Sequence, residues 1–173
     1  KRKGFNYLFE GLRILKEMTK EDHTFHENSI LLLIAGSGIE GIVDALNFEH
    51  HYMGLLDNTS GIASAYQIAD IFVCPSIEDS GPTMINQSIM CGTPVVAFEM
   101  GVSLDLVITG ETGYLAKLKD SQDLAKGIFE ILKLEKGEYD KLSENCRRLA
   151  LECCSSGAQI DEIERIIESS RIN

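Results

Sequence analysis

The middle of this 173-residue chain lacks positive charge, because neither lysine nor arginine occurs from Glu21 to Ala116. Acidic residues outnumber basic ones by 27 to 16, which gives a formal net charge of −11. Surfaces that follow the phosphates of nucleic acid need clustered lysine and arginine, so the composition argues against a nucleic-acid partner. Any phosphate bound in this stretch must be held by backbone amides, or by the amino-terminal cations Lys1, Arg2 and Lys3.

Long apolar runs are missing as well. No run approaches the roughly 20 residues that are needed to cross a bilayer, and the chain does not open on a signal-peptide pattern. With 44% hydrophobic residues, the chain can still bury a substantial core. We therefore expect a soluble, cytoplasmic protein with a single domain over residues 1–173.

Metal-binding spacings are also absent from the sequence. The five cysteines form an odd set without a CxxC pair, and the four histidines show no ligand spacing with carboxylates. The adjacent Cys153 and Cys154 would point about 100° apart on a helix and could not easily share one ion. We expect reduced thiols, no bound metal and no cofactor.

Apolar residues follow two alternating periods along the chain. Residues 5–20 have the three-and-four spacing of a helix with one buried face, whereas 30–35 is a continuous apolar run typical of a buried strand. This alternation predicts an α/β fold with a doubly wound, Rossmann-like parallel sheet. Strands are expected at 30–35, near 52–53, and at 71–74, 94–98 and 114–118. Helices are expected at 5–20, 39–46, 62–69, 82–90, 104–108, 121–134, 138–154 and 159–170, so that a helical tail covers about 136–173.

The two ends of this pattern are unusual. A doubly wound sheet normally starts with a strand, so we expect that a first strand, and whatever preceded it, is missing from this sequence. The last helix carries Ile160, Ile163, Ile166 and Ile167 on one side, and this side is expected to lie against an apolar surface.

The junction between the strand at 71–74 and the helix at 82–90 is the strongest candidate for a binding site. Its sequence, CPSIEDSGPTMINQSIMCG, joins a buried strand to a loop with Glu78 and Asp79, and Pro82 suits the first turn of the helix. Backbone amides at a helix start can bind anionic or hydroxyl-rich groups.

A second glycine-containing turn leaves an alternative open. Residues 36–41 fit GxGxxG after a predicted strand, which is typical of dinucleotide sites. The acid that such a site needs about 20 residues further on is represented only by Asp57, in a predicted loop. A nicotinamide-dependent oxidoreductase is one interpretation, and a plain tight turn is the other.

Several motifs together resemble the retaining nucleotide-sugar glycosyltransferases with two Rossmann-like halves, the GT-B enzymes of family 4 or group 1. The motifs are KGF before an amphipathic helix, AYQIADIFVCPS, SIMCGTPVVAFEMG and ITGETGYLAK. They extend from residue 3 to about 134, and they match only the carboxyl-terminal, donor-binding half of such enzymes. The resemblance implies transfer of a sugar from a nucleoside diphosphate sugar, with retention and without a metal. It also implies that the acceptor binds the missing amino-terminal half, that any peripheral membrane association comes through that half, and that this chain alone is inactive.

In this family two glutamates eight positions apart lie near the donor sugar and the nucleotide ribose. Asp79 stands at the first position and Gln87 at the second, so both depart from the family's pattern. The resemblance implies that Asp79 is catalytic and that Gln87 binds the ribose through its amide. The other donor contacts that it implies come from the loop and the helix start: Glu78, Ser80, Gly81 and Thr83.

The family also neutralises the donor diphosphate with an arginine and a lysine. Lys3, directly before Gly4, matches the lysine, and the arginine would fall before residue 1. Glu99, Gly101 and Asp105 align with a loop that often approaches the donor, although a structural role is equally open. Because Gln87 replaces a glutamate, a non-catalytic nucleotide-binding or interaction module stays open as the alternative function.

Overall fold

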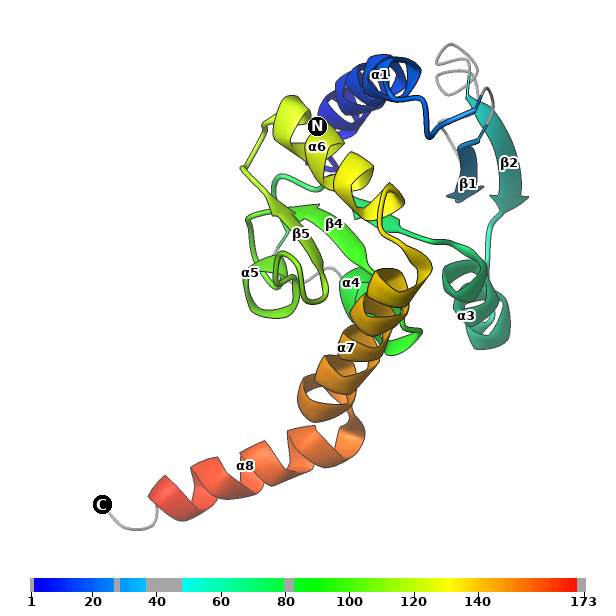
Figure 1. The fold of residues 1–173 in the computed structure, drawn as a ribbon. Helices are drawn as coiled ribbons and strands as arrows, with labels where there is room; N and C mark the ends of the chain where they lie inside the picture. The colour runs from blue at the N-terminus through cyan, green and yellow to red at the C-terminus, as the bar shows by residue number, and fades with distance from the viewer. Residues whose placement is uncertain (1, 27–28, 37–47, 80–82, 171–173) are drawn as a thin grey trace.

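The structure is a computed structural model, and it describes residues 2–26, 29–36, 48–79 and 83–170 (Figure 1). The helix expected at 39–46 and most of the GxGxxG segment lie outside the described residues. The other expected helices are present at their predicted places. They are α1 (Phe5–Glu21), α3 (Thr59–Ile68), α4 (Thr83–Met90), α5 (Ser103–Leu106), α6 (Ser121–Leu132), α7 (Lys136–Cys154) and α8 (Ser156–Ser170).

Parallel strands form two sheets within the described part of the chain. In the first sheet, β1 (Leu31–Ala35) pairs with β2 (Glu49–Gly54). The second sheet has the order β3 (Phe72–Cys74), β4 (Val95–Phe98) and β5 (Gly113–Ala116). Every one of these pairings is parallel, and described helices separate β2 from β3, β3 from β4 and β4 from β5. The predicted α/β, Rossmann-like class is thus confirmed.

The central strand β4 explains why helices cover both faces of the second sheet. Its four side chains are apolar and at most 1% exposed, as expected for a strand without a solvent face. Val96 and Phe98 pack with residues of α1 and α6 in one core cluster. Val95 and Ala97 point to the other side and pack with residues of α4 and α7. Figure 1 shows the two helix layers on opposite sides of β4 and β5, which is the doubly wound arrangement.

Local polar residues fix where several helices begin. The side chain of Asn58 accepts a hydrogen bond from the Gly61 amide at 2.7 Å and caps α3. Asp120 caps α6 in the same way, and Glu135 with Glu138 forms a capping box at the start of α7. These caps fix the first turns of the helices through short-range sequence alone.

The carboxyl-terminal helix α8 extends away from the rest of the fold (Figure 1). The expected apolar side is present, but Ile160, Ile163, Ile166 and Ile167 are 44–56% exposed. The surface that we expected to cover this side is therefore not provided by the described residues. None of the helices in the described part of the chain has the length and apolar character that a membrane span needs.

Candidate functional site

The amino-terminal segment lies against the loop that follows β3. The Ile77 amide donates a hydrogen bond to the Arg2 carbonyl at 2.9 Å. Gly4 is buried with φ +65°, and a Cβ atom at this position would lie 1.8 Å from the Pro75 carbonyl oxygen. Only glycine accepts both this backbone conformation and this approach. The residue between these two contacts, Lys3, is thereby fixed at the carboxyl end of β3.

Lys3 forms an ion pair with Asp79 across this contact. Its Nζ lies 3.0 Å from Asp79 Oδ2, and the two side chains are 38% and 17% exposed. Ligands of doubly wound proteins bind at the carboxyl ends of the parallel strands, which is where this pair lies. The structure therefore brings together the lysine and the acid that the sequence singled out, although they are 76 residues apart.

The end of β3 is buried in the core. Cys74, Pro75 and Ser76 are all buried. Burial raises the pKa of the Cys74 thiol, and hydrogen bonds from Ser76 oppose this shift only in part. Cys74 is therefore a protonated core residue and not a nucleophile.

The other predicted site residues differ in how the structure places them. Glu78 follows Ile77 in the loop, and its side chain is exposed. Thr83 and Gln87 are exposed on α4, next to the buried Ser88, whose hydroxyl fixes the end of the helix by donating to the Thr93 carbonyl at 2.9 Å. The predicted contacts Ser80 and Gly81 lie outside the described residues.

The loop that follows β4 depends on a residue that the sequence analysis missed. The hydroxyl of Ser103 is fully buried and lies 2.5 Å from the Phe98 carbonyl oxygen, while it accepts from the Met100 amide at 3.0 Å. Glu99 Oε1 lies 3.4 Å from the Leu118 amide, which ties the same loop to the turn that follows β5. The partners of Ser103 lie only three and five residues before it, but the turn that brings them to its hydroxyl begins where β4 ends, and the sheet sets that end.

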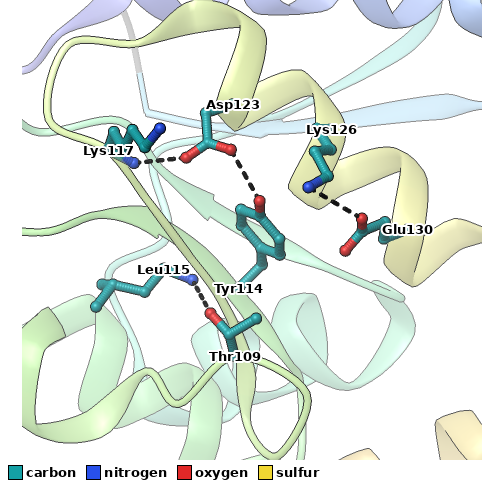
Figure 2. Close-up of polar contacts among 7 residues, drawn as sticks. All are labelled: Thr109, Tyr114, Leu115, Lys117, Asp123, Lys126 and Glu130. Atoms are coloured by element: carbon teal, nitrogen blue, oxygen red, sulfur yellow. Dashed lines mark hydrogen bonds and ion pairs between the residues drawn. The ribbon is translucent and has the colours of Figure 1, made fainter.

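A second polar cluster, between β5 and α6, has a structural role (Figure 2). Asp123 accepts hydrogen bonds from the Tyr114 hydroxyl and the Lys117 amide, both at 2.8 Å. Burial acts to raise the pKa of Asp123, but these hydrogen bonds outweigh it and lower that pKa. Lys126 lies 5.9 Å from the centre of the Tyr114 ring and pairs with Glu130 at 3.6 Å. Because each of these polar groups already has a partner in the fold, the cluster fastens the strand to the helix.

Among the described residues, no group of three or more histidine, cysteine, aspartate or glutamate side chains is placed to hold a metal ion. The cysteines are all free thiols, and they are Cys74, Cys91, Cys146, Cys153 and Cys154.

Comparison with known proteins places this architecture in a family. The sequence profile of the family "Glycosyl transferases group 1" matches residues 1–149. A phosphatidyl-myo-inositol mannosyltransferase from Mycobacterium leprae is 29% identical over 142 residues, which cover 76% of this chain and 34% of the relative. The N-acetyl-alpha-D-glucosaminyl L-malate synthase of Bacillus anthracis is 25% identical, over 78% of this chain and 36% of the relative. The chain thus spans about a third of the length of these curated relatives.

Solved structures show the same fold at low sequence identity. TarM from S. aureus, in complex with UDP and two further ligands, covers 95% of this chain with a TM-score of 0.74 at 17% identity, over 33% of its own length. The Anabaena protein HepE, in complex with UDP and glucose, covers 91% of this chain with a TM-score of 0.68 at 18% identity, over 44% of its length. At these identities the likeness concerns the fold alone. Since the family profile matches 149 of the 173 residues, the chain belongs to the glycosyl transferases of group 1.

Proposed function

We propose that residues 1–173 form the donor-binding domain of a retaining glycosyltransferase that uses a nucleoside diphosphate sugar. The observation that carries the proposal is the Lys3–Asp79 pair at the carboxyl end of β3. It offers a cation for a diphosphate and, within one ion-pair distance, a carboxylate for sugar hydroxyls. The UDP complexes of TarM and HepE support a nucleoside diphosphate as the ligand of this fold.

Lys3 acts on the leaving group in this proposal. When the bond between the sugar and the diphosphate breaks, negative charge grows on the phosphate oxygen. A fixed ammonium group stabilises that charge more in the transition state than in the ground state, which is the condition for a faster reaction. Because residues 21–116 contain no lysine or arginine, a second cation cannot come from β3, β4 or the loops after them. Metal-independent catalysis would therefore depend on Lys3 and on cations or amides contributed from elsewhere.

The remaining predicted residues have binding roles. Asp79 accepts hydrogen bonds from the sugar hydroxyls and holds the reacting carbon near the acceptor. Gln87 binds the ribose through its amide, and the exposed Glu78 and Thr83 border the donor. Ser80 and Gly81 are assigned to the donor by sequence only. We place the acceptor site outside residues 1–173, since the chain spans a third of its relatives.

Sugar-nucleotide turnover by the full-length protein tests the proposal. A panel of UDP- and GDP-sugars is incubated with the wild type and with Asp79→Ala, and released nucleoside diphosphate is measured. We expect turnover with at least one donor and a loss on the order of 10²-fold in Asp79→Ala. Asp22→Ala is the matched control, because Asp22 is equally buried at 18% exposure and also pairs with a lysine. Equal turnover in Asp79→Ala and Asp22→Ala would refute a catalytic role for Asp79.

A non-catalytic nucleotide-binding module is the second candidate function. It is favoured by one observation, which is that Gln87 places an uncharged amide where the family has a glutamate. The same experiment separates the two candidates. A full-length protein that binds a donor but neither transfers nor hydrolyses it, as wild type and as Gln87→Glu, is a binding module.

A further inference from the structure

We propose that Ser103 is a positioning residue for donor binding. Its buried hydroxyl fixes the turn 99–102, and this turn forms the wall of the donor site next to the loop that carries Asp79. The inference rests on the proposed function and deepens it, because it names a residue on which the shape of the site depends. Ser103 itself does not touch the ligand, since its side chain is 0% exposed.

The sheet places this turn beside the loop that carries Asp79. β3 and β4 are neighbouring parallel strands, and the last residues paired between them are Cys74 and Ala97. Both strands therefore leave the sheet at the same edge, one into residues 75–79 and the other into the turn 99–102. Ligands of doubly wound proteins bind at this edge. The turn is thus placed to border a ligand that contacts Asp79.

The hydroxyl of Ser103 holds the turn through three backbone groups. Its oxygen lies 2.5 Å from the carbonyl oxygens of Phe98 and Met100, and it accepts a hydrogen bond from the Met100 amide at 3.0 Å. One hydroxyl thus connects the last residue of β4 with the middle of the turn. The Glu99 amide donates to the Ala116 carbonyl at 2.8 Å, which fastens the first residue of the turn to β5.

The helix that follows the turn does not supply this order by itself. α5 has only four residues, and its N-cap residue Val102 makes no side-chain hydrogen bond to it. Isolated helices of this length are unstable in water. Without the Ser103 hydroxyl, the Met100 amide would lose its hydrogen bond and the turn would sample other shapes. If the shape that fits the donor were populated about 10% of the time, the apparent affinity for the donor would fall about tenfold.

Calorimetric titration of the full-length protein tests this inference. UDP, GDP, UDP-glucose and GDP-mannose are titrated into the wild type, Ser103→Ala and Ser103→Cys, and a thermal melt of each variant shows whether it is folded. We expect Ser103→Ala to bind whichever of these ligands the wild type binds about tenfold more weakly. Ser103→Cys should lie between the two, because a thiol of similar shape keeps a weak donor and acceptor.

Thr112→Val is the matched control. Thr112 is also buried, at 2% exposure, and its hydroxyl donates to the Leu106 carbonyl and accepts from the Ile108 amide, both at 2.8 Å. Unlike Ser103, Thr112 directly precedes a strand, β5, and therefore lies at the amino end of the parallel sheet. We expect Thr112→Val to lower the melting temperature about as much as Ser103→Ala does, and to keep the wild-type affinity.

The outcomes separate the inference from the proposed function. Wild-type affinity in folded Ser103→Ala overturns the inference and leaves the proposed function in place. An equal loss of affinity in Thr112→Val also overturns it, because a general loss of stability would then explain both variants. If Ser103→Ala does not fold, wild-type affinity in Ser103→Cys overturns the inference, and weaker binding than in Thr112→Val supports it. A wild type that binds none of the four ligands overturns the proposed function and the inference together.

Discussion

Among the described residues, two ion pairs connect distant segments of the chain, and their chemistry is almost the same. Lys3 and Asp79 lie 3.0 Å apart with side chains 38% and 17% exposed, and Lys133 and Asp22 lie 2.6 Å apart with side chains 42% and 18% exposed. The two pairs therefore cannot be told apart by distance or by burial. They differ in what surrounds them, and this difference separates a candidate site from a structural clamp.

The Lys133–Asp22 pair is built into the ends of two helices. Asp22 follows α1 and Lys133 follows α6, and the same aspartate accepts from the amide and the hydroxyl of Thr24 at 2.9 and 2.6 Å. The ammonium group of Lys133 also lies 5.3 Å from the centre of the Phe129 ring. Both charged groups are thus also engaged by residues close to them in the sequence, and the pair holds the ends of α1 and α6 together.

The Lys3–Asp79 pair lies at the carboxyl end of β3, between two backbone segments. The contacts that hold the amino-terminal segment there are made by the backbone of Arg2 and Gly4, and the Lys3 side chain is 38% exposed. The comparison teaches that an ion pair becomes a candidate site through its position at the carboxyl end of a parallel strand, and not through its distance or burial.

Among the substitutions that test this comparison of the two ion pairs, Gly4→Ala is expected to have the largest effect. The new Cβ would meet the Pro75 carbonyl oxygen at 1.8 Å in a backbone conformation with φ +65°. We expect a loss of roughly 2–3 kcal/mol in the free energy of unfolding, measured in urea, together with weaker binding of nucleoside diphosphate. Gly110→Ala is the control, because its φ of +81° is also positive but nothing lies within 4 Å of the new atom. Equal losses in the two variants would show that the approach to Pro75 has no energetic importance.

Replacing Lys3 and Lys133 one at a time tests whether the two ion pairs differ in nucleotide binding. Lys3→Met should weaken binding of the nucleoside diphosphate by about tenfold or more, because it removes a charge-assisted hydrogen bond to phosphate. Lys133→Met should leave this affinity unchanged, since Lys133 lies at the end of α6 and pairs with Asp22. Calorimetric titration with UDP and GDP measures both. A larger loss in Lys133→Met than in Lys3→Met would reverse the assignment of the two pairs.

The smallest expected effect concerns how much the Lys133–Asp22 pair stabilises the folded protein at low pH. The hydrogen bond from Lys133, with those from Thr24, holds the pKa of Asp22 well below its usual range. A depressed folded-state pKa contributes stability that is present above the unfolded pKa, near 3.9, and is lost as the pH falls through the folded pKa. The stability difference between wild type and Asp22→Asn should therefore be constant from pH 7 to 5 and shrink below about pH 4. Urea unfolding at pH 7, 5, 4 and 3 measures it, and a difference that grows toward pH 3 would contradict this interpretation.

Much of the fold could be predicted because its signals are local. The apolar runs at 71–74 and 94–98 are found as β3 and β4, and the periodic helices follow their caps. The contacts that shape the site are not local. Neither the packing of Gly4 on Pro75 nor the pairing of Asp22 with Lys133, 111 residues apart, leaves a pattern in the sequence. The resemblance to a family singled out Lys3 and Asp79, and the structure supplied the distance between them; their roles stay predictions.

Amide hydrogen exchange of the full-length protein, with and without a saturating nucleoside diphosphate, tests the central claim most directly. That claim is that the ligand binds where residues 2–4 meet residues 76–79. We predict that UDP or GDP slows exchange in peptides covering these two segments, including the amide of Ile77, and leaves the peptides around Asp22 and Lys133 unchanged. Protection that omits both segments while the ligand is bound elsewhere would contradict the account.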